Sequence, residues 1–160
     1  MAIADLIQSL AAHDVEFIIV GGVAALLQGA PINTIDLDIV YARSPANVDR
    51  ALAALAELGA VYRDDRRRLS PTRSHLESPG HKLLETRHGP LDLLGTIEQD
   101  TGFEDLLADA DWLDLGGIRV RVLSLPRLIR VKESLSRPKD QSMLAVLRAT
   151  LDERRFQGKE

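Results

Sequence analysis

The sequence predicts an α/β (α+β) fold in which helices flank a mixed β-sheet. Short apolar segments rich in β-branched residues, such as 15–20 and 35–42, alternate with amphipathic segments of helical period. Glycine and proline stand between these segments, where turns are expected, as in Gly29-Ala30-Pro31. The irregular order of strands and helices favours one mixed sheet with helices packed against it.

The first half of the chain predicts three helices and two strands. Ser44 is a good N-cap residue and Pro45 suits the first helical position, so a helix should begin there and run to about residue 58. The expected elements are a helix at 2–12, a strand at 15–20, a helix at 22–28, a strand at 35–42 and the helix at 45–58.

The second half predicts a hairpin followed by helices. The basic segment 64–78 is expected to be a loop with at most a short strand, and His88-Gly89 is the expected hairpin turn. The expected elements are strands at 81–87 and 90–95, a short helix near 103–109, a strand near 118–123, helices at 125–135 and 138–154, and a fraying tail at 156–160.

The bulk composition indicates a single domain over residues 1–160, with a core of about 13–124 and C-terminal helices at about 125–155. Apolar residues make up 45% and aromatic residues 4%, so aliphatic side chains must fill the interior. The absence of cysteine excludes disulfides, thiolate metal sites and cysteine nucleophiles. The first helix lacks the basic start of a signal peptide, and no apolar stretch approaches the roughly 20 residues that span a bilayer. We expect a cytoplasmic protein with no membrane partner.

The net charge of −4 is unevenly distributed. Residues 119–155 contain ten basic and four acidic residues, a net +6, which leaves −10 elsewhere. A second basic cluster comprises Arg63, Arg66, Arg67, Arg68 and Arg73. This pattern suits a protein that binds metal on one surface and a polyanion on another, but a salt-bridged helical surface explains it equally.

The most informative motif is the acid pair of Ile35-Asp36-Leu37-Asp38-Ile39. Residues two apart on a strand share one face, so both carboxylates should point the same way. Two such carboxylates repel each other and are costly to bury, and a divalent cation would remove both costs. Upstream, Gly21 and Gly22 follow an apolar strand and can offer backbone N–H groups to phosphate. The alternatives are an acidic face that points to solvent and a simple Gly-Gly turn.

Together these motifs resemble the signature of the nucleotidyltransferase (polymerase-beta-like) superfamily: an apolar residue, Gly-Gly or Gly-Ser, a spacer, and Asp-x-Asp between apolar residues. The segment Leu91-Asp92-Leu93-Leu94 is similar to the strand that carries the family's third acid. Residues 125–132 and 137–140 resemble the helical "Lys … Arg-x-Lys-Asp" element of small bacterial members, including the AbiE-type (type IV toxin) nucleotidyltransferases. The likeness covers about residues 13–150.

The resemblance implies a nucleotidyltransferase-like mixed sheet with a C-terminal helical extension. It also implies that Asp36, Asp38 and Asp92 hold Mg²⁺ or Mn²⁺ and that Asp92 accepts the proton of the attacking hydroxyl. The implied substrate is a nucleoside triphosphate (NTP), such as ATP, cradled by Gly21 and Gly22. The nucleoside monophosphate would pass to an acceptor hydroxyl on RNA, such as tRNA, or on a protein, and a toxin–antitoxin role with a cognate antitoxin would fit.

The C-terminal motif concentrates a scarce residue. The chain has four lysines against sixteen arginines, and two of the four, Lys132 and Lys139, fall in this motif. By resemblance Lys132 contacts the triphosphate, while Lys139 and Asp140 position the last helix or the substrate. Pro138 interrupts the helix between the two lysines, and a solvated helix face is the plainer interpretation.

Two departures from the family pattern support a second hypothesis. Gly22 stands where relatives often have serine, and Ile32-Asn33 stands where they often have a basic residue. A catalytically inactive module of the same fold, which binds nucleotide or a partner protein, would tolerate both. A dinucleotide-binding unit does not fit, because the sequence after the first strand lacks G-x-G-x-x-G. The four histidines show no metal-ligand spacing, and Trp112 is expected to be a packing residue.

Overall fold

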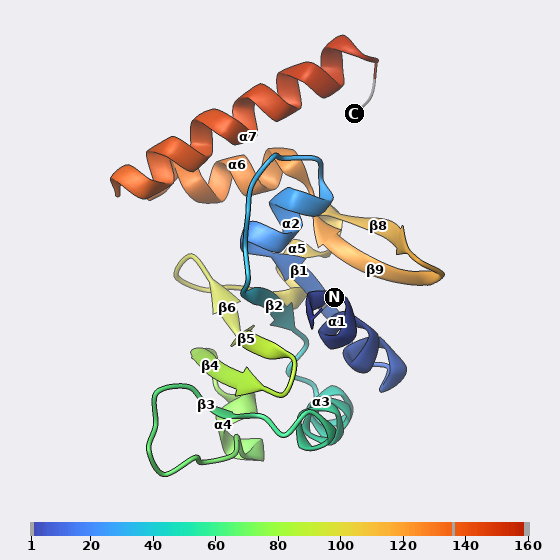
Figure 1. The fold of residues 1–160 in the computed structure, drawn as a ribbon, viewed down its shortest axis with the longest axis vertical. Helices are drawn as coiled ribbons and strands as arrows, with labels where there is room; N and C mark the ends of the chain where they lie inside the picture. The colour runs from blue at the N-terminus through green and yellow to red at the C-terminus, as the bar shows by residue number, and fades with distance from the viewer. Residues whose placement is uncertain (1, 136, 159–160) are drawn as a thin grey trace.

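The computed structural model describes residues 2–135 and 137–158 and contains the expected mixed sheet. Seven strands lie in the order β3-β4-β5-β2-β1-β9-β8 (Figure 1). β2 pairs in parallel with β5 and β1 with β9, while the remaining neighbours are antiparallel. The strands are β1 Phe17–Val20, β2 Leu37–Tyr41, β3 Val61–Tyr62, β4 His81–Thr86, β5 Gly89–Leu94, β8 Ala110–Leu115 and β9 Ile118–Leu123. The predicted fold class is therefore confirmed.

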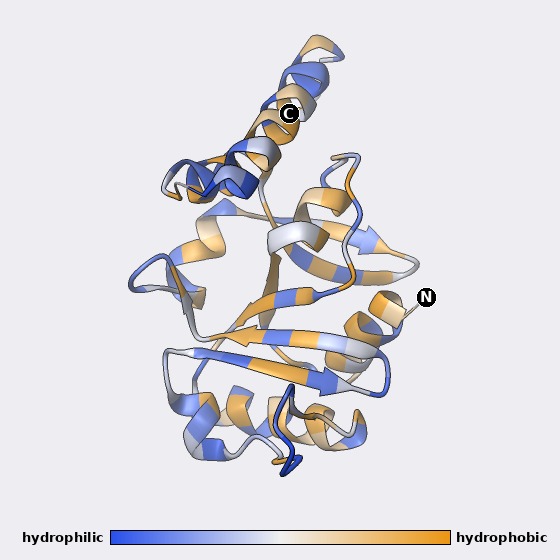
Figure 2. Cartoon of the chain, turned by 60° about the vertical axis from the view of Figure 1, so that its left-hand side comes forward, coloured by the Kyte–Doolittle hydropathy of each residue, from blue (hydrophilic) through white to orange (hydrophobic). Residues whose placement is uncertain are grey.

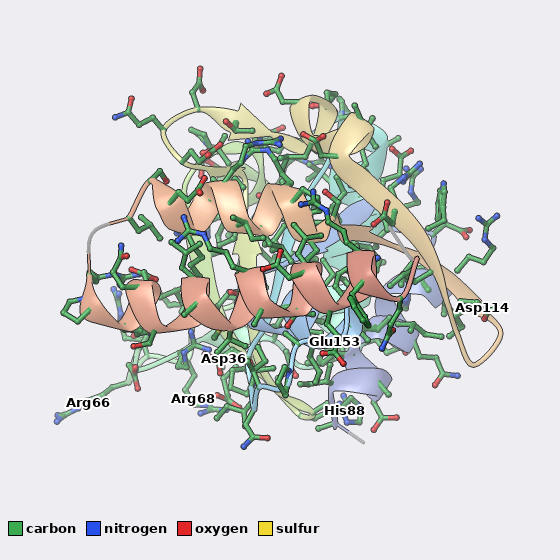
Figure 3. All side chains as sticks on the ribbon, turned by 90° about the horizontal axis from the view of Figure 1, so that it is seen from above. Asp36, Arg66, Arg68, His88, Asp114 and Glu153 are labelled. Carbon is green, nitrogen blue, oxygen red and sulfur yellow. The ribbon has the colours of Figure 1, made fainter. Side chains whose placement is uncertain are left out.

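Helices cover the sheet, and the last two helices form a C-terminal extension of the domain. They are α1 Ala2–Ala12, α2 Gly21–Leu27, α3 Pro45–Glu57, α4 Arg73–Glu77, α5 Phe103–Leu106, the 3-10 helix Leu107–Asp109, α6 Leu125–Glu133 and α7 Pro138–Phe156. α6 and α7 lie side by side at one end of the molecule, next to α2 (Figures 1 and 3). Residues 159 and 160 of the tail expected to fray lie outside the described residues.

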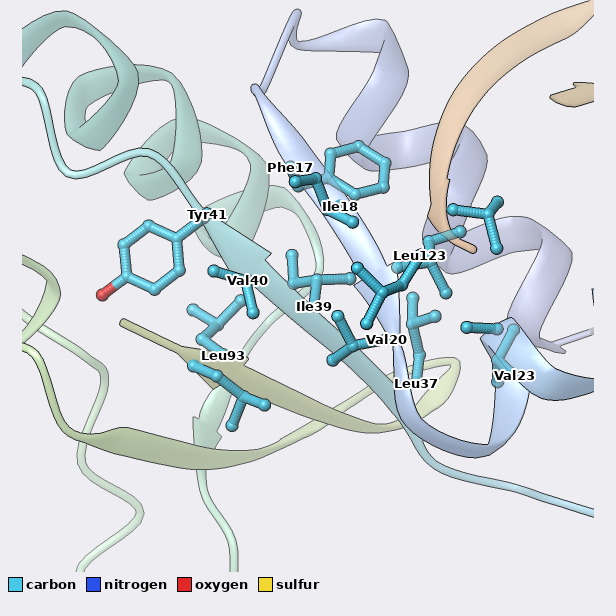
Figure 4. Close-up of a cluster of buried hydrophobic side chains, with 14 of the residues drawn as sticks. Phe17, Ile18, Val20, Val23, Leu37, Ile39, Val40, Tyr41, Leu93 and Leu123 are labelled. Atoms are coloured by element: carbon cyan, nitrogen blue, oxygen red, sulfur yellow. The ribbon is translucent and has the colours of Figure 1, made fainter. Parts of the chain in front are cut away.

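The core is aliphatic, as the composition requires. Ile18, Ile19, Leu37, Ile39 and Val40 on β1 and β2 are completely buried and pack with residues of neighbouring strands (Figure 4). These two strands occupy the middle of the sheet, where both faces are covered. The centre of the sheet is thus rigidly packed, and polar side chains at the ends of its strands are held in fixed positions.

Several elements differ from the sequence predictions. The segment expected to be a loop contains α4, because the Thr72 side chain accepts a hydrogen bond from the His75 backbone and His75 caps in return. The two-residue strand β3, the strand β8 and the small ribbon of β6 (Thr96–Ile97) with β7 (Thr101–Gly102) were not expected. Their sequences are too short, or at β8 too acidic, to give a clear strand pattern. The loop that connects β3 to α4 is hydrophilic (Figure 2).

Two large apolar residues are exposed: Ile35, which was expected to lie in the strand at 35–42, and Trp112, which was expected to be a packing residue. Ile35 is 76% accessible because β2 begins only at Leu37. Trp112 is 50% accessible on the edge strand β8, where the guanidinium of Arg121 lies 4.3 Å from its ring centroid and that of Arg119 5.0 Å. The indole is therefore covered by arginines and not packed in the core, an arrangement that cation–π attraction favours. Within the described residues, none of the helices combines the length and the apolar character needed to cross a bilayer.

Candidate nucleotide and metal site

Sheet register brings together the first strand, Asp38 and Asp92. Val20 of β1 is paired with Asp38 of β2, and Asp38 is paired with Asp92 of the parallel strand β5. Register partners project from the same face of a sheet, so the two carboxylates are neighbours although 53 residues separate them in the chain. The predicted convergence of Asp38 and Asp92 is present in the structure.

Gly21 follows Val20 and lies against the Asp38 side chain. It has φ +67°, in the left-handed region, and a Cβ at this position would lie 2.5 Å from Asp38 Oδ2. A Cβ on Gly22 would lie 2.9 Å from Thr34 Oγ1. Glycine at both positions lets the backbone approach Asp38 and the segment that precedes β2. The Gly-Gly motif thus makes the turn after β1 and also lets the backbone pack closely against Asp38 and Thr34.

Asp38 lies in an unfavourable electrostatic position. Burial first, then the adjacent Asp92 carboxylate and the charge of Asp36, raise the pKa of Asp38 from 3.8 to about 7, while Arg63 opposes the shift. Its Oδ1 atom is buried and has no hydrogen-bond partner among the described residues. A buried carboxylate oxygen without a donor is costly, and such groups are commonly completed by a ligand or an ion.

Arg63 is the cation already present in the site. It follows β3, and its Nη2 donates to Asp92 Oδ1 at 2.7 Å while Nη1 donates to the Leu84 carbonyl at 3.2 Å. The two side chains of the ion pair are only 21% and 14% accessible. Burial lowers the pKa of Arg63, but Asp92, with smaller contributions from Asp36 and Glu85, raises it overall. Sequence reasoning placed Arg63 in a surface cluster and missed its contact with Asp92.

Asp36 lies just before β2 and is partly buried. Its charge raises the pKa of both Asp38 and Arg63, so it acts on the same site. Among the described residues, however, no three Asp, Glu or His side chains are already arranged as a metal-binding group. The fit is nevertheless chemically sound, because Asp38 offers an unpartnered oxygen beside Asp92 and carboxylates are the preferred protein ligands of Mg²⁺.

A cavity opens next to these carboxylates, between the sheet and the C-terminal helices. It has a volume of about 180 Å³, and Gly21, Gly22, Asp38 and Lys132 line it together with apolar side chains. The apolar lining comes from the seven-stranded sheet, β6, α2, α6 and α7, and comprises Val20, Ala25, Leu94, Ile97, Leu123, Leu128, Val131, Met143 and Leu147. The cavity therefore brings together Asp38, both glycines and Lys132, whereas Asp36 and Asp92 do not line it.

The C-terminal motif forms an ion-pair cluster. Asp140 is fully buried and accepts from Lys132 Nζ at 2.9 Å and from Arg137 Nε at 2.7 Å. These two hydrogen bonds, Arg137 first, hold the pKa of Asp140 below its ordinary value. Asp140 thus fixes α7 against α6, and Lys132 reaches both Asp140 and the cavity. Lys139 is exposed on α7 and does not line the cavity.

No protein-family model matches this sequence, and no curated protein matches it either. Solved structures do share its fold. The lincosamide antibiotic adenylyltransferase LnuA, bound to lincomycin, superposes with a TM-score of 0.64 at 10% identity, over 93% of this chain and 96% of its own. ANT(2'')-Ia in complex with adenylyl-2''-tobramycin gives 0.59 at 14% identity, over 93% and 87%. A Thermotoga maritima protein provisionally named a nucleotidyltransferase gives 0.57 at 18% identity, over 95% and 91%. The chain has the nucleotidyltransferase fold.

Proposed function

We propose that the protein is a metal-dependent nucleotidyltransferase that moves a nucleoside monophosphate from an NTP to an acceptor hydroxyl. The observation that carries this proposal is the row formed by Gly21, Asp38 and Asp92, with an unpartnered Asp38 oxygen, at the edge of a cavity that Lys132 also lines. The shared fold is consistent with it.

Each group has a distinct role in this proposal. Asp38 and Asp92, with Asp36 beside them, would hold Mg²⁺ or Mn²⁺, which when bound neutralises charge on the triphosphate. The backbone N–H groups of Gly21 and Gly22 would hold phosphate oxygens, because neither residue has a side chain of its own to cover them. Asp92 would accept the proton of the attacking hydroxyl.

The C-terminal helices would complete the nucleotide site. Lys132 would place its ammonium group on the triphosphate, as a compact point charge suited to that contact. Asp140 would hold Lys132 and α7 in position, in keeping with the ion pairs of its buried carboxylate. Lys139 would contact ligand only where it extends beyond the cavity, since its side chain is exposed.

The acceptor hydroxyl of the proposed reaction is still to be identified by experiment. RNA such as tRNA and protein side chains are candidates, and a toxin–antitoxin component would use one of them. The antibiotics in the two compared complexes add small hydroxylated molecules to the classes to be tested. Growth arrest on induced expression, abolished by Asp38→Asn, would support the toxin assignment.

The test follows the label from the NTP. Purified protein is incubated with Mg²⁺ and each candidate acceptor, in parallel with α-labelled and γ-labelled NTPs. Nucleotidyl transfer puts the α label alone on the acceptor, and Asp38→Asn should abolish it while Glu153→Gln, exposed on α7, should not. Transfer of the γ label would instead indicate a kinase.

The second candidate is a non-catalytic module of the same fold. It is favoured by the Arg63–Asp92 ion pair, which occupies one of the acids needed for catalysis. Isothermal titration separates the two candidates. Magnesium-dependent NTP binding that is lost in the Asp36→Ala, Asp38→Ala double variant supports an enzyme, whereas a folded protein that binds no NTP supports the module.

A further inference from the structure

Arg63 belongs to a different part of the chain from the rest of the site. It comes from the edge of the sheet, where its backbone N–H donates to the Leu83 carbonyl at 2.9 Å and so continues the β3–β4 pairing. Leu83 is in register with Asp92, which is in register with Asp38. One row across the sheet thus runs from Arg63 over β4 to the two acids.

The Arg63 guanidinium contacts one member of the acid pair, Asp92, and its charge also acts on Asp38. It is bonded to Asp92, while Asp38 Oδ1 has no donor among the described residues. The neighbouring arginines of the loop have other surroundings, because Arg67 pairs with Asp65, and Arg66 and Arg68 are exposed (Figure 3). Arg63 is therefore singled out by its contact and not by the basic composition of its segment.

A divalent cation on Asp38 and Asp92 would compete for the oxygen that Arg63 holds. Asp92 Oδ1 lies 2.7 Å from Nη2, so a cation that takes this oxygen must weaken or break the ion pair. Arg63 would keep its second hydrogen bond, to the Leu84 carbonyl, which anchors the side chain nearby.

We infer that Arg63 is a built-in counter-ion of the metal-free site, which stabilises the acid pair before loading and sets the affinity for the divalent cation by competing for Asp92. This inference rests on the proposed cation site. It assigns Arg63 as a positioning residue, because it acts through Asp92.

The experiment compares Arg63→Gln with Arg66→Gln, which removes an exposed arginine three residues away. Thermal unfolding in EDTA requires no metal, and Arg63→Gln should lower Tm by several degrees while Arg66→Gln leaves it unchanged. Titration with Mn²⁺ alone at pH 8 should show binding roughly tenfold tighter in Arg63→Gln than in wild type, the scale of one lost charge-assisted hydrogen bond. Arg66→Gln should bind Mn²⁺ as wild type does.

A second measurement uses the wild-type protein, in case Arg63→Gln folds poorly. The guanidinium NMR signals of Arg63 should shift on addition of Mg²⁺, and those of Arg66 should not. The inference is overturned if Arg63→Gln binds Mn²⁺ as tightly as wild type or more weakly. It is also overturned if the Arg63 signals do not shift with Mg²⁺, or if neither protein binds Mn²⁺. If Arg63→Gln binds Mn²⁺ and wild type does not, the inference stands, and it is the metal dependence of the wild-type enzyme that fails.

Discussion

At the scale of single residues, Asp38 carries a pronounced electrostatic conflict. Its carboxylate is partly buried, lies against Asp92 and keeps one oxygen without a donor among the described residues. The fold imposes this conflict through strand register, because neither acid can move to the opposite face of the sheet without breaking the β2–β5 pairing. Residues of this kind usually serve function at a cost in stability.

Asp38 should make the stability of the metal-free protein depend on pH. Its pKa is about 7 in the folded protein against an ordinary value of 3.8, so between about pH 4 and 7 the folded state binds more protons than the unfolded chain. The free energy of unfolding should therefore fall as pH rises through this window. Asp38→Asn should flatten that slope and add roughly 2 kcal/mol at pH 8, a figure reduced from the full shift because the group is partly solvated. Denaturant unfolding in EDTA at several pH values measures both. An unchanged slope in Asp38→Asn, with Glu153→Gln as control, would contradict the assignment.

Gly21 should be far less tolerant of substitution than another glycine of the same backbone conformation. Gly21→Ala adds a Cβ at 2.5 Å from Asp38 Oδ2 to the strain of φ +67°, whereas Gly116 has φ +62° with nothing within 4 Å of the added Cβ. We expect a loss of about 1 kcal/mol for Gly116→Ala and roughly 2–4 kcal/mol for Gly21→Ala, together with weaker NTP binding. Chemical denaturation of the two variants makes the comparison, and equal losses would show that Asp38 simply moves aside.

At the scale of elements, the pair α6 and α7 depends on one buried carboxylate with two partners of different exposure. Lys132 is 24% accessible and lines the cavity, whereas Arg137 is 64% accessible and does not. Asp140 bonds to both, so the structural role of the motif can be separated from its proposed ligand-binding role by substituting one partner or the other.

Lys132→Met and Arg137→Met should therefore have different effects. Both remove a bond to Asp140 and should loosen α7, which amide hydrogen exchange of 138–156 would report. We expect Lys132→Met alone to weaken Mg·NTP binding strongly, by roughly tenfold or more, since a charged contact is lost. Calorimetry on the two variants decides. Equal affinities would mean that Lys132 acts only through α7.

At the scale of the whole molecule, the cavity lies between the sheet and the C-terminal helices, so a bound nucleotide would contact both. Binding to the folded state alone stabilises it by mass action. Mg·NTP should thus slow hydrogen exchange in α6 and α7 as well as around Gly21, and raise Tm. The Asp38→Asn variant should lose this protection. If hydrogen exchange slowed only in α6 and α7, or only around Gly21, the nucleotide would not lie in the cavity between them.

The sequence predicted the fold class and the acids that meet, but not how their charge is balanced. Asp38 could be found because it stands two residues from Asp36 among apolar neighbours, and Asp92 because its apolar segment resembles the strand that carries the third acid of nucleotidyltransferases. Arg63 could not, since its contact depends on the register of β3, a two-residue strand without a readable pattern. Ile35 misled for a related reason: an apolar residue next to a strand looks like part of it, yet the chain turns outward before Leu37. Lys82, buried with its ammonium group bonded to Tyr41 and two carbonyls, likewise carries no sequence mark.

Asp38 and Asp92 also meet only if β2 and β5 pair in the observed register. Side chains alternate along a strand, so a slip of β5 by one residue would present Leu91 or Leu93 beside Asp38 and turn Asp92 to the opposite face. An insertion or deletion of one residue in the turn at 87–88 that shifted this register would therefore leave a compact chain with a hydrophobic patch where the second acid should be. The two residues at 87–88 set the register of β4 with β5, so the length of this turn helps to determine which face of the sheet carries the Asp92 side chain.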